Sequence, residues 1–148
     1  MRWDMGIRAL LLVMVGLSIG CGYVMSGRWE DDPKNWARAF HSTKPKDVVV
    51  VHSEYWRDPH WSYEAGYAFE IRGNEALRDQ LFRENHLSQV PSRELENVGA
   101  VCGSCPTWFA PGPLSQYDVW RYSDEPASNF RVLVNRDTGD MFLVDYQL

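Results

Sequence analysis

The most compact chemical motif in this sequence is a CxxC pair, in which Gly103 and Ser104 separate Cys102 from Cys105. Two cysteines at this spacing can form a structural disulfide, exchange disulfides as a redox pair, or supply half of a zinc site. Redox pairs gain reactivity at the start of a helix, and the prolines at positions 106, 111 and 113 exclude a long helix here. A zinc site needs further ligands, and the sequence has no second CxxC. The motif therefore favours a disulfide that shapes one loop.

A second group of reactive side chains lies at positions 52–63, which hold four aromatic residues, two histidines, one arginine and two acids. Clusters of Trp, Tyr and Arg are typical of recognition surfaces. Two other interpretations stay open: the aromatics can fold back as a lid over one end of a sheet, or His52 and His60 can act in catalysis or share a metal. The candidate binding residues are Tyr55, Trp56, Arg57, His60 and Trp61, together with Trp108 in the CxxC loop.

Motifs typical of enzymes are scarce. The sequence contains no phosphate-binding loop, dinucleotide-binding fingerprint or HExxH motif. Glu64 and Glu70 share one face of an expected strand but are roughly 20 Å apart along it, which is too far for the carboxylate pair of a glycosidase. We therefore assign no catalytic residue, metal or cofactor, and keep an envelope hydrolase using His52 or His60 as an alternative.

Residues 1–21 have the features of an export signal. Arg2 and Arg8 precede an apolar run from Ala9 to Ile19, which suits a signal peptide and is short for a membrane span. The run ends in Gly20 and Cys21, and this ending resembles the lipobox of bacterial lipoproteins. The resemblance implies a signal peptide over residues 1–20 and lipid attachment at Cys21.

Two other interpretations of this segment stay open. Apolar residues resume from Tyr23 to Met25, so that Ala9–Met25 reaches the lower limit for an uncleaved anchor, and simple secretion is the third possibility. All three place the rest of the chain outside the cytoplasm, in an oxidising compartment. Lipidation of Cys21 would leave Cys102 and Cys105 as an even pair, so we expect a disulfide between them.

The patterns predict an α+β fold: an antiparallel sheet of about five strands with one or two helices on one face. One helix is expected at 33–41, capped by Asp32, and another from Asn74 to about position 85. Residues 53–62 would connect the first two strands, and Gly139 suits a tight turn between the last two. β-branched or alternating residues predict strands at 48–51, 63–71, 117–122, 129–135 and 141–146.

Length and charge complete the expectation. A chain of 148 residues suffices for one domain at 33–148 after a tether at 21–32. The net charge of −5 argues against a nucleic-acid partner, because phosphate contacts need a basic surface. We therefore expect a lipoprotein of the bacterial cell envelope, tethered to the membrane by a lipid or a helix and facing the periplasm or the exterior. It would bind a protein partner without catalysis, as an immunity or inhibitor-like module, and a thiol–disulfide redox protein remains the alternative.

Overall fold

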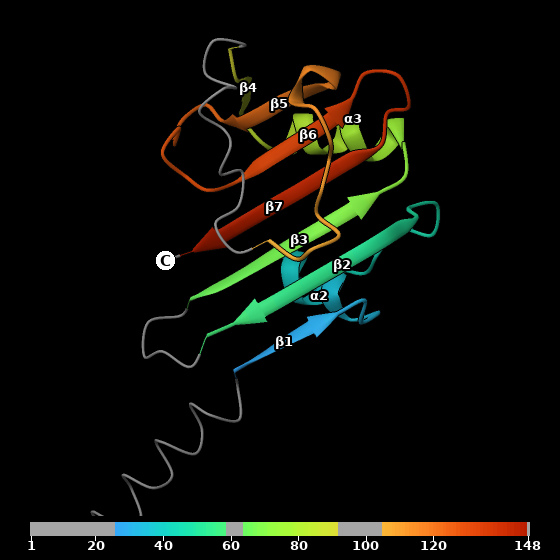
Figure 1. Ribbon diagram of the computed structural model, residues 1–148, viewed down its shortest axis with the longest axis vertical. Helices are drawn as coiled ribbons and strands as arrows, with labels where there is room; N and C mark the ends of the chain where they lie inside the picture. Colours follow the sequence, from blue (N-terminus) through green and yellow to red (C-terminus); the bar gives the residue numbers. More distant parts are fainter. Residues whose placement is uncertain (1–25, 59–63, 92–104, 148) are drawn as a thin grey trace, which may run out of the picture.

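One antiparallel sheet organises the fold, as seen in a computed structural model that describes residues 26–58, 64–91 and 105–147 (Figure 1). Its seven strands lie in the order β1-β2-β3-β7-β6-β5-β4. The expected α+β architecture is confirmed, whereas the expected number of about five strands is too low. The elements are β1 (Gly27–Glu30), α2 (Asn35–Phe40), β2 (Val50–Arg57), β3 (Ala65–Ile71), α3 (Glu75–Glu84), β4 (Leu87–Gln89), the 3-10 turn η2 (Leu114–Gln116), β5 (Tyr117–Tyr122), β6 (Arg131–Asn135) and β7 (Met141–Gln147).

The two additional strands lie at the two edges of the sheet. Strand β1 occupies residues that the sequence predicts to be a tether, and β4 follows α3, where the sequence predicts no strand. Both are short, with four and three residues, so neither offers enough alternating positions to stand out as a strand. Each is held by its neighbour, β1 by β2 and β4 by β5.

Strand β2 is longer than expected. The apolar run suggested a strand ending at Val51, but β2 continues to Arg57 and pairs with β3 through Arg57↔Ala65. The expected connection at 53–62 is therefore wrong, because its first five residues belong to the strand. The sequence does not predict this extension because Ser53 and Glu54 are polar. In the fold both are buried and hydrogen-bonded, Ser53 to Asn35 and Glu54 to Arg28.

The two helices begin differently. In α3 the expected cap is confirmed, because the Asn74 side chain accepts a 2.8 Å hydrogen bond from the Leu77 amide. Helix α2 begins later than expected, with Lys34 at the cap position and no side-chain cap. Asp32 instead accepts from the Lys34 amide at 2.8 Å, and this bond lowers the pKa of the Asp32 carboxyl.

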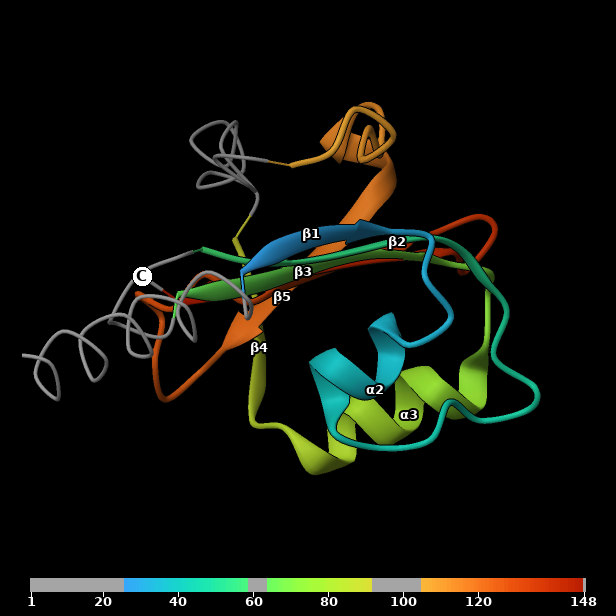
Figure 2. The ribbon, with the colours of Figure 1, turned by 90° about the horizontal axis from the view of Figure 1, so that it is seen from below.

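The sheet separates two layers (Figure 2). Both helices cover one face, here called the helix face, and residues 105–116 with η2 lie over the other, the loop face. Side chains alternate between these faces along each strand. The helix-face core contains Trp36, Val48, Phe69, Ile71, Leu77, Phe130, Val132, Val134, Met141 and Leu143. The smaller loop-face core contains Val90, Tyr117, Val119, Leu133 and Phe142.

Candidate functional site

Residues 105–116, here called the strap, cross the loop face from β5 toward β2 (Figure 1). A tight turn shapes the strap, because the Phe109 amide donates to the Pro106 carbonyl at 3.0 Å. The Phe109 ring meets Phe142 of β7 edge-on at 5.3 Å, and Leu114 packs against the same core. These contacts fix the strap on the sheet.

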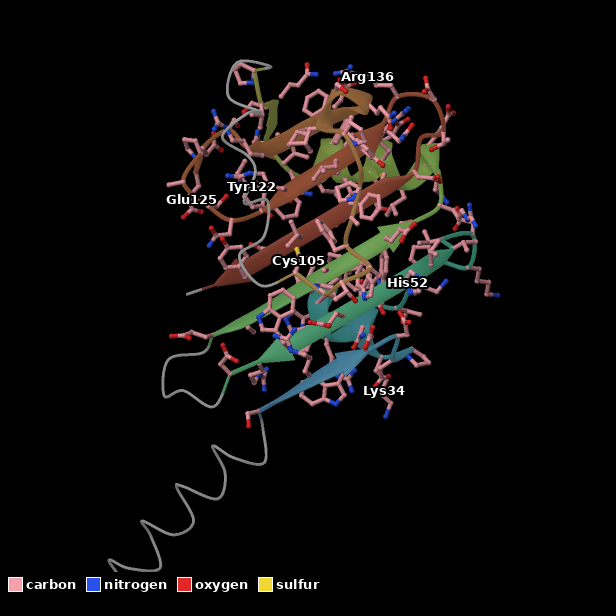
Figure 3. All side chains as sticks on the ribbon, viewed as in Figure 1. Lys34, His52, Cys105, Tyr122, Glu125 and Arg136 are labelled. Carbon is pink, nitrogen blue, oxygen red and sulfur yellow. The ribbon has the colours of Figure 1, made fainter. Side chains whose placement is uncertain are left out.

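The tip of the strap joins strand β2. The Trp108 ring stacks on His52 with centroids 5.4 Å apart and an interplanar angle of 24°. On its other side, His52 Nδ1 lies 3.2 Å from Asp31 Oδ2, while Asp31 Oδ1 accepts from the Ser53 amide at 2.8 Å. Asp31 adopts a left-handed backbone with φ 49°. The side chains of His52 and Asp31 keep 41% and 51% exposure, so a partner can reach them. Figure 3 labels His52 on β2.

A second cluster on the loop face lies toward the β1 edge. Glu54 is 3% exposed, and its carboxylate accepts a 2.6 Å hydrogen bond from Arg28. Burial raises the pKa of Glu54, and the Arg28 guanidinium opposes that rise. The Arg28 guanidinium also lies 5.7 Å from the centre of the Trp56 ring. Trp56 covers Gly66, where an added Cβ would lie 2.3 Å from the indole, so Trp56 serves packing.

The structure separates the candidate binding residues. Tyr55 and Trp56 are both buried and are adjacent on β2, so they point to opposite faces and form no common surface. Arg57 is half-buried at the end of β2, and Trp108 is half-buried on the strap. The candidates His60, Trp61, Cys21 and Cys102 lie outside the described residues, so lipidation at Cys21 and the pairing of Cys102 with Cys105 stay predictions.

A hollow that the sequence did not predict lies on the helix face, between α2, α3 and the segment 42–45. This inter-helix cleft has a volume of about 570 Å³, within the range of small-molecule sites. It exists because two helices of six and ten residues cannot cover a sheet of seven strands. Its aromatic lining consists of Trp36, Phe40, Tyr67, Tyr122 and Phe130.

An acid stands beside the aromatic floor of the inter-helix cleft. Asp145 of β7 pairs in register with Tyr67 of β3, so the two side chains share the helix face. Burial raises the pKa of Asp145, and the nearby Glu125 carboxylate adds to the rise, while the Tyr146 amide and Arg131 oppose it. Burial and the Asp145 charge together raise the pKa of both Tyr67 and Tyr122. Figure 3 shows Tyr122 and Glu125 at the same end of the sheet.

A smaller hollow of about 450 Å³ adjoins the N-terminal end of α2. Asp31 and Asp32 line it together with Lys44 and Lys46, so its charges compensate one another. Trp36 separates this hollow from the inter-helix cleft, because its side chain lines both.

The described part of the chain shows neither a metal-binding cluster nor a membrane-spanning helix. Within 26–58, 64–91 and 105–147, no three His, Cys, Asp or Glu side chains are placed to hold a metal ion. In the same ranges, no helix has the length and apolar character that a membrane crossing requires. Comparison of the chain with protein-family models, with curated proteins and with solved structures gives no match.

Proposed function

We propose that this chain is a membrane-tethered protein of the bacterial cell envelope that works by non-catalytic binding, as an immunity or inhibitor-like module. The tether is the expected lipid on Cys21, and the partner is another envelope protein. The binding surface is the contact of the strap with β2, made by Trp108, His52 and Asp31.

One observation carries this proposal: the strap brings Trp108 from a distant part of the sequence onto His52, with 5.4 Å between ring centroids. Two segments that the sequence marks separately as recognition surfaces therefore meet. The turn at Pro106 and the Phe109–Phe142 contact fix Trp108 before binding, which reduces the entropy lost on association. A fixed, half-exposed tryptophan beside charged groups has the composition of a binding hot spot.

The hydrolase alternative has one favourable observation, the Asp31–His52 pair at 3.2 Å. A carboxylate at Nδ1 is the arrangement that orients a histidine as a general base. Such a base also needs a nucleophile within reach of its second ring nitrogen. Among the hydrogen bonds of the described residues, His52 makes only the one to Asp31. Binding is therefore the better-supported function.

Site-specific photo-crosslinking tests the binding surface. Trp108→p-benzoylphenylalanine in the full chain, produced in its own bacterium, should crosslink one envelope protein. The matched control is Glu75→p-benzoylphenylalanine on α3, which is exposed and lies on the helix face. Adding His52→Ala to the position-108 variant should reduce the yield severalfold, since the stacking partner is lost. Identical products from both positions, or none from position 108, would overturn the proposal.

Mass spectrometry of the mature N-terminus tests the tether separately. We expect a diacylglyceryl group on Cys21 as the first residue. An intact segment from Met1 to Cys21 would exclude the lipoprotein assignment and leave the anchored helix. Titration of the thiols in redox buffers addresses the redox alternative: a Cys102–Cys105 bond far more reducing than the known exchange catalysts indicates a structural disulfide.

A further inference from the structure

We propose that the inter-helix cleft binds a small organic cation with an alkylammonium head, of the size of tetramethylammonium or choline. This site lies on the helix face, away from the strap, and does not depend on the function proposed above. It would make the protein a receptor for a soluble ligand as well as for a partner.

Aromatic rings surround the cleft on several sides. Trp36 and Phe40 of α2 approach each other at 4.6 Å, and Phe40 meets Tyr67 of the sheet edge-on at 5.2 Å. From the other half of the sheet, Tyr122 and Phe130 stack at 4.5 Å. All five rings line the same hollow. Several rings around one volume are the arrangement that recognises quaternary ammonium groups, because their negative faces attract a desolvated cation.

The charges near the cleft also favour a cation. Among the described residues that line it, none is Lys or Arg, and Glu84 of α3 is the acid. Asp145 stands next to Tyr67 in the sheet and forms no ion pair within the described ranges. Arg131, which opposes the raised pKa of Asp145, directs its guanidinium to the Ser128 and Phe130 carbonyls. A bound ammonium would supply the missing positive charge.

The remaining lining fits a head group with a short polar arm. Ser42, Thr43, Gln80 and Asn85 provide hydroxyl and amide groups at the cleft, which a long apolar chain would leave without partners. Trp36 lines the cleft, and its buried indole Nε1 has no hydrogen-bond partner among the residues that the structure describes. A hydroxyl on the ligand is the kind of acceptor that such a donor lacks.

Two isosteric probes test the proposal by isothermal titration calorimetry on the full chain in detergent. Choline carries the positive charge, and 3,3-dimethylbutan-1-ol has the same shape without it. We expect choline to bind about tenfold more tightly than the alcohol, as a desolvated cation–π contact implies. Equal affinities would show a merely apolar cleft, and no choline binding would show no site. Both outcomes overturn the proposal.

Matched variants locate the binding. Tyr122→Leu removes one ring of the cleft and should weaken choline severalfold, whereas Tyr122→Phe keeps the ring and should retain binding. Tyr146→Leu, a half-buried tyrosine of β7 on the loop face, is the control and should leave affinity unchanged. Asp145→Asn should weaken choline and not the neutral alcohol, which tests the charge even where Tyr122→Leu unfolds the protein. Equal losses for both probes would overturn the proposal.

Discussion

The two faces of the sheet bury their apolar side chains in different ways. The helix face buries its core under α2 and α3, with Trp36, Phe69 and Leu143 in one continuous cluster. The loop face buries a smaller cluster under the strap, through Phe109 and Leu114, and places the Arg28–Glu54 pair beside it. We therefore expect the helix face to supply more of the stability than the loop face does.

The difference also separates two kinds of site. Helices α2 and α3 and the sheet form most of the walls of the inter-helix cleft, with the segment 42–45 completing its lining, so its volume depends mainly on the packing of the helices on the sheet. The contact of Trp108 with His52 depends on an irregular segment held by a few rings. Binding residues on loops positioned by a rigid scaffold are common. Substitutions that affect one face and spare the other test this division.

The largest expected contrast is between two phenylalanines. Phe69→Ala on the helix face should lower the free energy of unfolding by about 3–5 kcal/mol, because Phe69 is fully buried and contacts Trp36 and Phe40. Phe109→Ala on the strap should cost about 1–2 kcal/mol, because the ring is only half-buried and loses less apolar contact. Urea denaturation of both variants measures the difference. Equal costs would refute the division of stability between the faces.

The next contrast concerns close packing on the loop face. Gly66→Ala should cost about 1–3 kcal/mol, because the new Cβ would lie 2.3 Å from Trp56 and 2.9 Å from the Asp145 carbonyl oxygen. In a Trp56→Ala background the cost should fall, since the indole is gone, but the clash with the backbone carbonyl remains. A double-mutant cycle measures this coupling. Additive effects would show that Trp56 does not rest on Gly66.

Two acids, one on each face, give a smaller and pH-dependent contrast. Burial raises the folded-state pKa of Glu54 from 4.5 and of Asp145 from 3.8. As pH rises, each carboxyl therefore ionises in the unfolded chain before it does so in the folded one. The free energy of unfolding falls while pH rises from the ordinary pKa to the raised one, and the loss persists at higher pH. Glu54→Gln and Asp145→Asn should thus gain stability relative to the parent as pH rises above these ordinary values.

Thermal unfolding at pH 3 to 7 checks this pair. The gain should be larger for Asp145→Asn, because no ion pair to Asp145 forms among the described residues, whereas Arg28 compensates Glu54. Loss of the Arg28 bond offsets part of the gain in Glu54→Gln. A stability difference that does not change with pH would contradict the raised pKa values.

How far the sequence predicts this fold depends on the length of each local pattern. The alternation of apolar and polar residues that ends at Ile71 predicts β3, and Asn74 predicts the start of α3. Gly139 predicts the turn between β6 and β7, where it adopts φ 73°. These signals are local and need no knowledge of neighbours. Strands β1 and β4 are too short to give such a signal, and the polar residues of β2 are buried only because Asn35 and Arg28 reach them.

The candidate site is less predictable than the fold for the same reason. The sequence singled out Trp108 by composition but could not place it on His52, because the strap and β2 meet only in the folded sheet. It placed Tyr55 and Trp56 on one binding loop, whereas a strand directs them to opposite faces. No sequence motif marks the inter-helix cleft: Tyr67 lies on β3, Asp145 on β7 and Phe130 just before β6, and these residues become neighbours only in tertiary structure.

The smallest contrast involves two residues with left-handed backbones, Asp31 with φ 49° and His41 with φ 50°. His41 ends α2 and is exposed, so His41→Gly should raise stability by about 0.5 kcal/mol, since glycine adopts this conformation without strain. Asp31→Gly should instead lower it by about 1 kcal/mol, because the Ser53 amide and His52 lose their acceptor. Urea denaturation distinguishes the two signs. If Asp31→Gly also stabilised the protein, the strain at Asp31 would outweigh its hydrogen bonds, and the orientation of His52 toward Trp108 would have to come from the strap alone.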